Sequence, residues 1–68
     1  MKIQYFEQTD TLYIEFRHTE IAESCDYDDN TLLDIDAEGN ICGMTLEHAR
    51  KRTDIPSFSY ENIVEQAA

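Results

Sequence analysis

The stretch from Thr31 to His48, TLLDIDAEGNICGMTLEH, predicts a β-hairpin and decides the fold. Apolar residues alternate with polar or small ones on both sides of AEGN, which is the two-residue period of half-buried strands. Gly39 would supply the positive φ that a tight turn needs. We therefore expect strands over about 31–36 and 41–48, with the turn between them.

The register of this hairpin follows if its apolar residues gather on one face. An even-length loop achieves this, and either Glu38-Gly39 or the four residues 37–40 would serve. The predicted pairs are Ile35 with Cys42 and Leu33 with Met44. In this arrangement Asp34 and Asp36 are outward residues.

Three more strands are expected before the hairpin, over about 2–6, 11–17 and 21–27. The clearest is TLYIEFR, where Leu12, Ile14 and Phe16 alternate with polar residues and Tyr13. The turn-forming segment EQTD joins it to the first strand. The third has a weaker pattern that suits an edge or partly exposed strand.

The alternating strand pattern ends after residue 52. Pro56 cannot continue a sheet, so residues 53–58 are expected to be a connector. Ser59 is a candidate N-cap for a helix over about 59–67, whose apolar face would pack on the sheet or on a second subunit. The predicted fold is a single α+β domain over 1–68, with an antiparallel β-meander of four to five strands in 1–52 and one C-terminal helix.

Fifteen acids against five bases give a net charge of −10. Such a charge repels phosphate backbones and anionic lipid, so we expect neither direct nucleic-acid binding nor membrane binding. The basic run Arg50-Lys51-Arg52 is interpreted as a solvated strand end. A basic protein is the natural partner.

A cytoplasmic location is expected, because the N-terminus does not resemble a signal peptide and no stretch approaches the length of a membrane span. Cys25 and Cys42 are the two cysteines, enough for one disulfide. A reducing compartment and their apolar strand contexts favour buried free thiols instead of a disulfide.

The acids of DIDAEGN mimic the opening of a calcium-binding loop that starts at Asp34. The twelfth position of that template needs a bidentate Glu, and here it is Thr45. Weak cation binding by Asp34, Asp36 and Glu38, collected with the acids near 26–29, is the remaining metal hypothesis. A zinc site from His18, Cys25, Cys42 and His48 is disfavoured because these residues are singly scattered.

Two segments, MKIQYFEQTDTLYIEF and LLDIDAEGNICGMTLEHARKR, resemble the small bacterial proteins of the domain of unknown function 2283 family over about residues 1–52. One departure from the family pattern is Thr45, where the family often has glutamate. The resemblance implies the same meander and assigns no activity. It also suggests an antitoxin-like role, since some members are thought to be encoded beside toxin-like proteins. The positions that match are Tyr5, Asp10, Leu12, Tyr13, Ile14, Asp34, Gly39 and Gly43.

The leading functional hypothesis is therefore a non-catalytic, antitoxin-like interaction module that binds a basic protein and needs no cofactor. The alternative hypothesis is a metal-binding or metal-responsive domain. An enzyme is not expected, because no motif gathers the Cys and His residues or supplies an oxyanion site. Ile41 is an apolar residue on the predicted outward face, which suggests that a second subunit or a partner covers this face. A homodimer is therefore expected. Gly39 and Gly43 are assigned structural roles. The residues predicted to bind a partner are Tyr13, Asp34, Asp36, Glu38 and Ile41.

Overall fold

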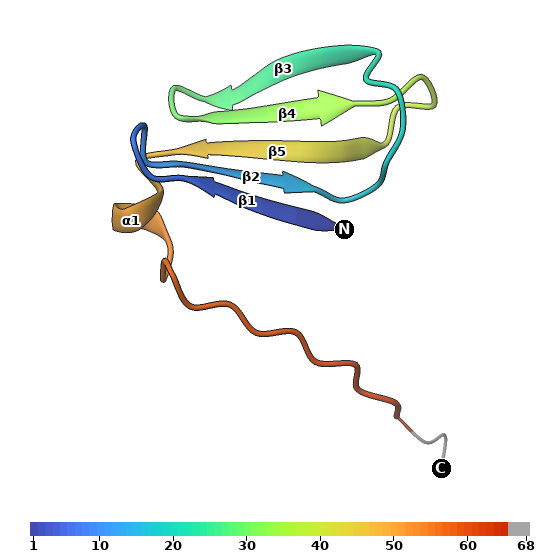
Figure 1. The fold of residues 1–68 in the computed structure, drawn as a ribbon. Helices are drawn as coiled ribbons and strands as arrows, with labels where there is room; N and C mark the ends of the chain where they lie inside the picture. Colours follow the sequence, from blue (N-terminus) through green and yellow to red (C-terminus); the bar gives the residue numbers. More distant parts are fainter. Residues whose placement is uncertain (66–68) are drawn as a thin grey trace.

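The computed structural model describes residues 1–65 and contains one five-stranded antiparallel sheet (Figure 1). The predicted fold class and the five strands are confirmed. In space the strands run in the order β1-β2-β5-β4-β3, so β1 and β3 are the edges. The elements are β1 (Lys2–Phe6), β2 (Thr11–Glu15), β3 (Glu23–Asp28), β4 (Thr31–Ile35), β5 (Ile41–Glu47) and α1 (Ala49–Arg52).

The strand order departs from a strictly sequential one between β2 and β3. Strands β3, β4 and β5 follow one another as hairpins, and β5 returns to pair with β2, which is a Greek-key arrangement. The long connection 16–22 passes the end of the sheet, where the backbone N–H groups of Phe16 and Arg17 both donate to the Cys42 carbonyl. Strand β3 is exposed along its whole length, as expected for an edge.

The pairing gives the sheet two chemically different faces. The apolar face carries three rows across the strands, Ile3–Ile14–Met44–Leu33–Cys25, Tyr5–Leu12–Leu46–Thr31–Asp28 and Ile41–Ile35–Glu23. The acidic face carries the alternate residues, in the rows Gln4–Tyr13–Thr45–Leu32–Asp26, Lys2–Glu15–Gly43–Asp34–Ser24 and Phe6–Thr11–Glu47. Each strand therefore contributes to two surfaces.

The β4–β5 hairpin confirms one predicted pair and corrects the other. Leu33 lies opposite Met44 as predicted, but Ile35 lies opposite Ile41 because β5 contains an extra residue, Cys42. The loop is odd: the N–H of Asp36 donates to the Asn40 carbonyl at 2.9 Å, which leaves three residues in the turn. Gly39 has φ 87°, the left-handed conformation that closes such a loop. The bulge offsets the odd loop and restores the apolar register beyond it.

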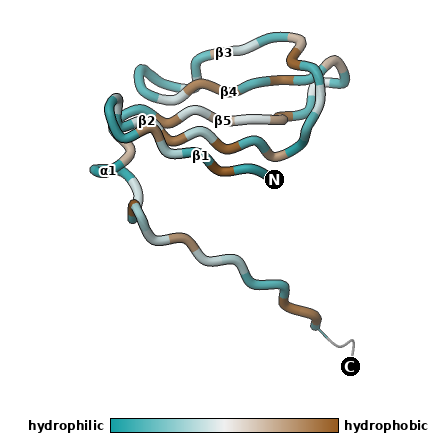
Figure 2. Tube along the Cα trace, viewed as in Figure 1, coloured by the Kyte–Doolittle hydropathy of each residue, from teal (hydrophilic) through white to brown (hydrophobic). Residues whose placement is uncertain are grey.

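The helix lies earlier in the chain than predicted. It is the four-residue α1, in place of a helix over 59–67 packed on the sheet. Residues 59–65 contain no helical turn, while residues 66 and 67 lie outside the described part. Tyr60 lines an open hollow with Met1 and Ile3, and beyond it the chain runs away from the sheet (Figure 1). A helix of two turns is unstable unless it packs on something, and these residues have no surface to pack on in the described chain. Figure 2 shows hydrophobic positions spaced along this extended segment.

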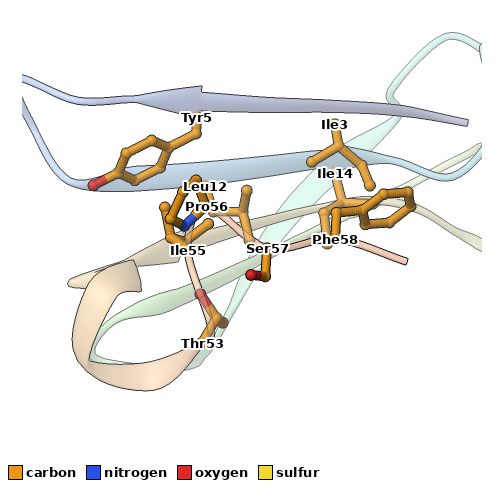
Figure 3. Close-up of a pocket in the computed structure, with 9 residues that line it drawn as sticks. All are labelled: Ile3, Tyr5, Leu12, Ile14, Thr53, Ile55, Pro56, Ser57 and Phe58. Carbon is orange, nitrogen blue, oxygen red and sulfur yellow. The ribbon is translucent and has the colours of Figure 1, made fainter. Parts of the chain in front are cut away.

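The connector 53–58 lies against the apolar face beside β1 and β2. With these strands it encloses an open apolar groove of about 340 Å³ (Figure 3). The buried apolar residues of the described chain are few, namely Leu12, Cys42 and Ala49. The fold therefore consists of one sheet with a thin strip of core rather than two packed layers.

Candidate interaction surface

A hydrogen-bonded group of side chains occupies the centre of the acidic face. Asp34 on β4 is only 6% exposed. Its Oδ1 accepts a 2.7 Å hydrogen bond from the Ser24 hydroxyl, and its Oδ2 accepts a longer one, 3.4 Å, from the Tyr13 hydroxyl. Desolvation, then the negative charges of Asp34 and Glu15, raises the pKa of Tyr13. Tyr13 is thus held as a neutral hydrogen-bond donor beside a carboxylate.

Gly43 makes room for this group. A Cβ at Gly43 would lie 2.9 Å from the Tyr13 hydroxyl oxygen and 3.0 Å from Asp34 Oδ2. Real Cβ atoms do not approach neighbours this closely, so a side chain here would displace one of the two. The glycine in the middle of a central strand is explained by this close approach.

Next to this group, at the β3–β4 turn, the sheet is hollowed by about 150 Å³. The acidic residues Asp26, Asp28, Asp29 and Glu47 line the hollow together with Asn30, Thr31, Leu32 and Thr45. Three of the four acids come from one hairpin, because the turn brings both its strand ends and its loop residues together. The lining of the hollow therefore combines four acidic residues with one leucine.

One of these acids already has a cation beside it. The backbone N–H of Asn30 donates to Asp28 Oδ1 at 2.8 Å, and the Arg52 guanidinium lies 3.8 Å from Asp28 Oδ2. The hydrogen bond from Asn30, followed by one from the Thr31 side chain, lowers the pKa of Asp28. Arg52 also donates to the carbonyls of Asn30 and Glu47. The basic run, predicted to be a solvated strand end, therefore forms the short helix α1, and its last residue, Arg52, is hydrogen-bonded to the sheet.

The DIDAEGN acids do not form the outward cluster that was predicted. Asp36 is 7% exposed, and its Oδ1 accepts 2.9 Å hydrogen bonds from the backbone N–H groups of Glu38 and Asn40. The bond from Asn40, ahead of the one from Glu38, lowers the pKa of Asp36. The prediction that Asp34 and Asp36 point into solvent is wrong, because each satisfies hydrogen-bond donors of its own fold.

The five residues predicted to bind a partner fall into two places. Tyr13 and Asp34 meet at the centre of the acidic face, whereas Asp36, Glu38 and Ile41 lie at the β4–β5 turn. Glu38 is exposed, and Ile41 is 50% exposed. The acids at 28 and 29 lie at the opposite end of β4 from this turn, so the two acidic clusters do not merge as expected.

The residues considered for zinc are also separate. His18 lies in the connection after β2, with its Nδ1 3.6 Å from Glu15 Oε1, while His48 follows β5. Within residues 1–65 there is no group of three or more His, Cys, Asp or Glu side chains placed to hold a metal ion. Both cysteines are free, but the expectation that both are buried is wrong, since Cys25 is exposed and Cys42 is buried.

A second network, missed from the sequence, joins the β1–β2 turn to α1. The Tyr5 hydroxyl donates to Asp10 Oδ1 at 2.6 Å, and Arg50 Nε donates to the Tyr5 oxygen at 2.8 Å. The backbone N–H of Arg50 also donates to Asp10 Oδ1, at 3.1 Å. Asp10 has φ 53°, a left-handed conformation that aspartate tolerates better than most residues. We call Tyr5, Asp10 and Arg50 the turn clamp.

The turn clamp changes the acid–base behaviour of its members. The hydrogen bond from Tyr5, with the backbone and charge of Arg50, lowers the pKa of Asp10. The same bond raises the pKa of Tyr5 because its phenol donates to the carboxylate. Tyr5 and Asp10 are five residues apart around a turn, a spacing with no motif of its own, and Arg50 lies 40 residues further on.

Comparisons with known proteins give one family. No helix in residues 1–65 is long and apolar enough to cross a membrane. No curated protein and no solved structure matches the chain. Residues 2–50 match the family described as protein of unknown function (DUF2283), and this segment contains all five strands. Since the match spans well over half of the 68 residues, the chain belongs to the DUF2283 family of proteins of unknown function.

Proposed function

We propose that this chain is a non-catalytic interaction module that binds a basic protein partner through the acidic face of its sheet. The observation that carries the proposal is the hollow at the β3–β4 turn. Four acidic residues line it, and Asp28 is the one that lies near a cation of the chain itself. Asp26, Asp29 and Glu47 have no ion-pair partner within residues 1–65.

The chemistry of the hollow suits a guanidinium or ammonium group. A hollow of about 150 Å³ accommodates the head of one long basic side chain, and its apolar stem would lie over Leu32. Lys2, at the far edge of the sheet, is the basic residue among the paired positions of this face. Clustered charge of one sign speeds the encounter with an oppositely charged partner and selects against acidic ones.

The predicted site residues have separate roles in this proposal. Tyr13 offers an aromatic contact in the centre of the face, and Asp34 holds its hydroxyl in place. Glu38 is exposed at the β4–β5 turn and offers a second contact region at that end of the sheet, whereas Asp36 shapes the turn. Ile41 is exposed beside it, but it lies opposite Ile35 and so on the side of the apolar face, not on the outward face where it was predicted. An antitoxin-like role in the bacterial cytoplasm belongs to the same proposal, and two free thiols agree with a reducing compartment.

An arginine-rich peptide tests the charge chemistry without knowledge of the partner. We expect the wild-type chain to bind it, with the amide signals of Asp26, Asp29 and Glu47 shifting most in an NMR titration. The double variant Asp26→Asn/Asp29→Asn should weaken binding about tenfold or more, because two of the carboxylates lose their charge. The matched control Glu7→Gln/Glu20→Gln removes two exposed charges elsewhere and should change affinity about twofold or less.

Equal weakening by both double variants would contradict the proposal, since net charge rather than the hollow would then govern binding. The product of the neighbouring gene is the partner to test next, with the same two variants. The metal alternative, which uses Asp34, Asp36 and Glu38, predicts a different result. It requires calcium or zinc to raise the melting temperature by several degrees and a chelator to reverse the rise.

A further inference from the structure

Strand β3 is a free edge of the sheet over its whole length. All of its residues, Glu23–Asp28, are exposed, and in Figure 1 no other part of the described chain lies along its outer side. Its inner side pairs with β4. An edge strand leaves one row of backbone N–H and C=O groups unpaired, and an extended chain can add there as a further strand. The outer side of β3 is therefore a place where a partner can join the sheet.

The charge of β3 selects the kind of strand that fits beside it. Glu23, Asp26 and Asp28 are acids, and the strand carries no base. Two β3 strands from two copies would bring these acids together, and like charges on neighbouring strands destabilise their pairing. Charged residues on an edge are one means by which proteins prevent pairing between copies. The same acids attract a strand with basic side chains, so they exclude a second β3 and favour a basic chain.

The other edge of the sheet, β1, does not have this charge. Its only charged residue is Lys2, and its remaining residues are polar or apolar. On the apolar face it also borders the groove formed with the connector 53–58. A basic strand meets no carboxylate on β1, so charge complementarity favours β3.

Asp26 connects this edge to the hollow of the proposed function. It belongs to β3 and also lines the hollow at the β3–β4 turn. Ser24 and Asp26 are the β3 residues in the rows of the acidic face. Side chains of an added strand alternate between the faces in the same way, so one of them would lie beside Asp26 at the hollow. The bulge in β3 comes after Asp26, which leaves residues 23–26 regular for pairing.

We propose that an extended basic segment of the partner adds to β3 as a sixth strand. Its backbone pairs with the free edge, and one lysine or arginine on the side of the acidic face places its charged head in the hollow. Residues 23–26 span about 13 Å, so a segment of about six residues is long enough. This inference rests on the proposed function and adds the conformation and the charge pattern of the bound segment.

A peptide of about eight residues that alternates arginine and valine is the probe, with the isotope-labelled wild-type chain. We expect NOEs between the peptide backbone and β3. Hydrogen exchange should slow about tenfold or more at the β3 amides that face away from β4, because these amides gain hydrogen bonds. The β1 amides are the internal control, and their exchange should not change.

A second peptide has the same sequence with a methyl group on every backbone nitrogen. It keeps the charge but has no backbone N–H to donate, so it should bind about tenfold or more weakly than the first peptide. Equal affinity of the two peptides, or NOEs to β1 instead of β3, would overturn strand addition. Shifts of the β3 amides when the chain alone is diluted would assign this edge to a second copy and overturn it as well.

The double variant Asp26→Asn/Asp29→Asn separates this inference from the proposed function. If both peptides bind equally well and the variant weakens both, strand addition is wrong but the acidic hollow still binds basic side chains. If neither peptide binds the wild-type chain, both proposals are wrong. If only the unmethylated peptide binds tightly and the variant weakens it, both proposals are supported.

Discussion

The two faces of this sheet are built from the same five strands and have opposite chemistry. Leu32 and Leu33 make the contrast plain, since they are adjacent and alike in exposure. Leu33 lies in a row with Ile14 and Met44, whereas Leu32 lies in a row with Tyr13 and Asp26. Alternation along a strand thus allows a very small chain to carry two separate surfaces, one held by apolar contact and one by charge.

The largest expected effect is on the apolar face. Leu12→Ala removes a side chain that is 7% exposed and should lower the free energy of unfolding by about 2–4 kcal/mol. Leu32→Ala on the acidic face is the control, with an expected loss of about 1 kcal/mol because it is only half-buried. Urea unfolding at one fixed protein concentration measures both. Equal losses would contradict the assignment of the core strip to the apolar face.

On the acidic face, Gly43→Ala should cost about 1–2 kcal/mol, because the new methyl group meets the Tyr13 hydroxyl and Asp34. In a Tyr13→Phe background the contact with the hydroxyl is gone. The cost of Gly43→Ala should then fall by about 0.5 kcal/mol or more, as a double-mutant cycle would show. Additive costs would mean that the hydroxyl does not crowd this glycine.

Loss of the hydrogen bond from Ser24 to Asp34 should lower stability less than Gly43→Ala does. Ser24→Ala removes the donor of a 2.7 Å bond to a buried carboxylate, and should lower stability by about 1 kcal/mol. Ser59→Ala, at an exposed position beyond the sheet, should change stability by about 0.3 kcal/mol or less. A Ser24 variant as stable as wild type would show that water replaces the hydroxyl.

The smallest effect is a pH dependence. The folded pKa values of Asp10, Asp28 and Asp36 lie below their ordinary value of 3.8. The stability that these carboxylates contribute is therefore fully present above pH 3.8 and is lost as the pH falls through the folded values. Asp10→Asn should make melting temperature fall less steeply below that pH. An unchanged slope would show that the turn clamp does not stabilise the charged form of Asp10.

Much of the fold could be predicted because the sequence of each strand shows by itself which alternate residues are buried. The pairing of Leu33 with Met44 followed from that pattern alone. The bulge at Cys42 could not be predicted. An odd loop with a bulge gives the same pairing of apolar residues beyond it as an even loop without one, so the sequence pattern does not distinguish the two. The helix over 59–67 was predicted from a local pattern alone. In the described part of this segment, residues 59–65, no helix forms.

The candidate site was harder to predict. Alternation placed Asp34 on the correct face, but it does not report that Ser24 and Tyr13 donate to this carboxylate. The acids of the hollow belong to a hairpin whose turn gathers them at the end of the sheet away from DIDAEGN. The turn clamp depends on a contact between Tyr5 and Arg50, which are 45 residues apart, and no local pattern reports such a contact.

The most direct test compares the salt dependence of the two surfaces in the same buffer. The free energy of unfolding in urea and the binding of the arginine-rich peptide are both measured between about 50 and 500 mM salt. We predict that peptide binding weakens about tenfold or more, because screening removes charge attraction, while the free energy of unfolding stays constant or rises. A free energy of unfolding that falls as salt rises, or peptide binding that does not weaken, would contradict the division of the sheet into an apolar and an acidic surface.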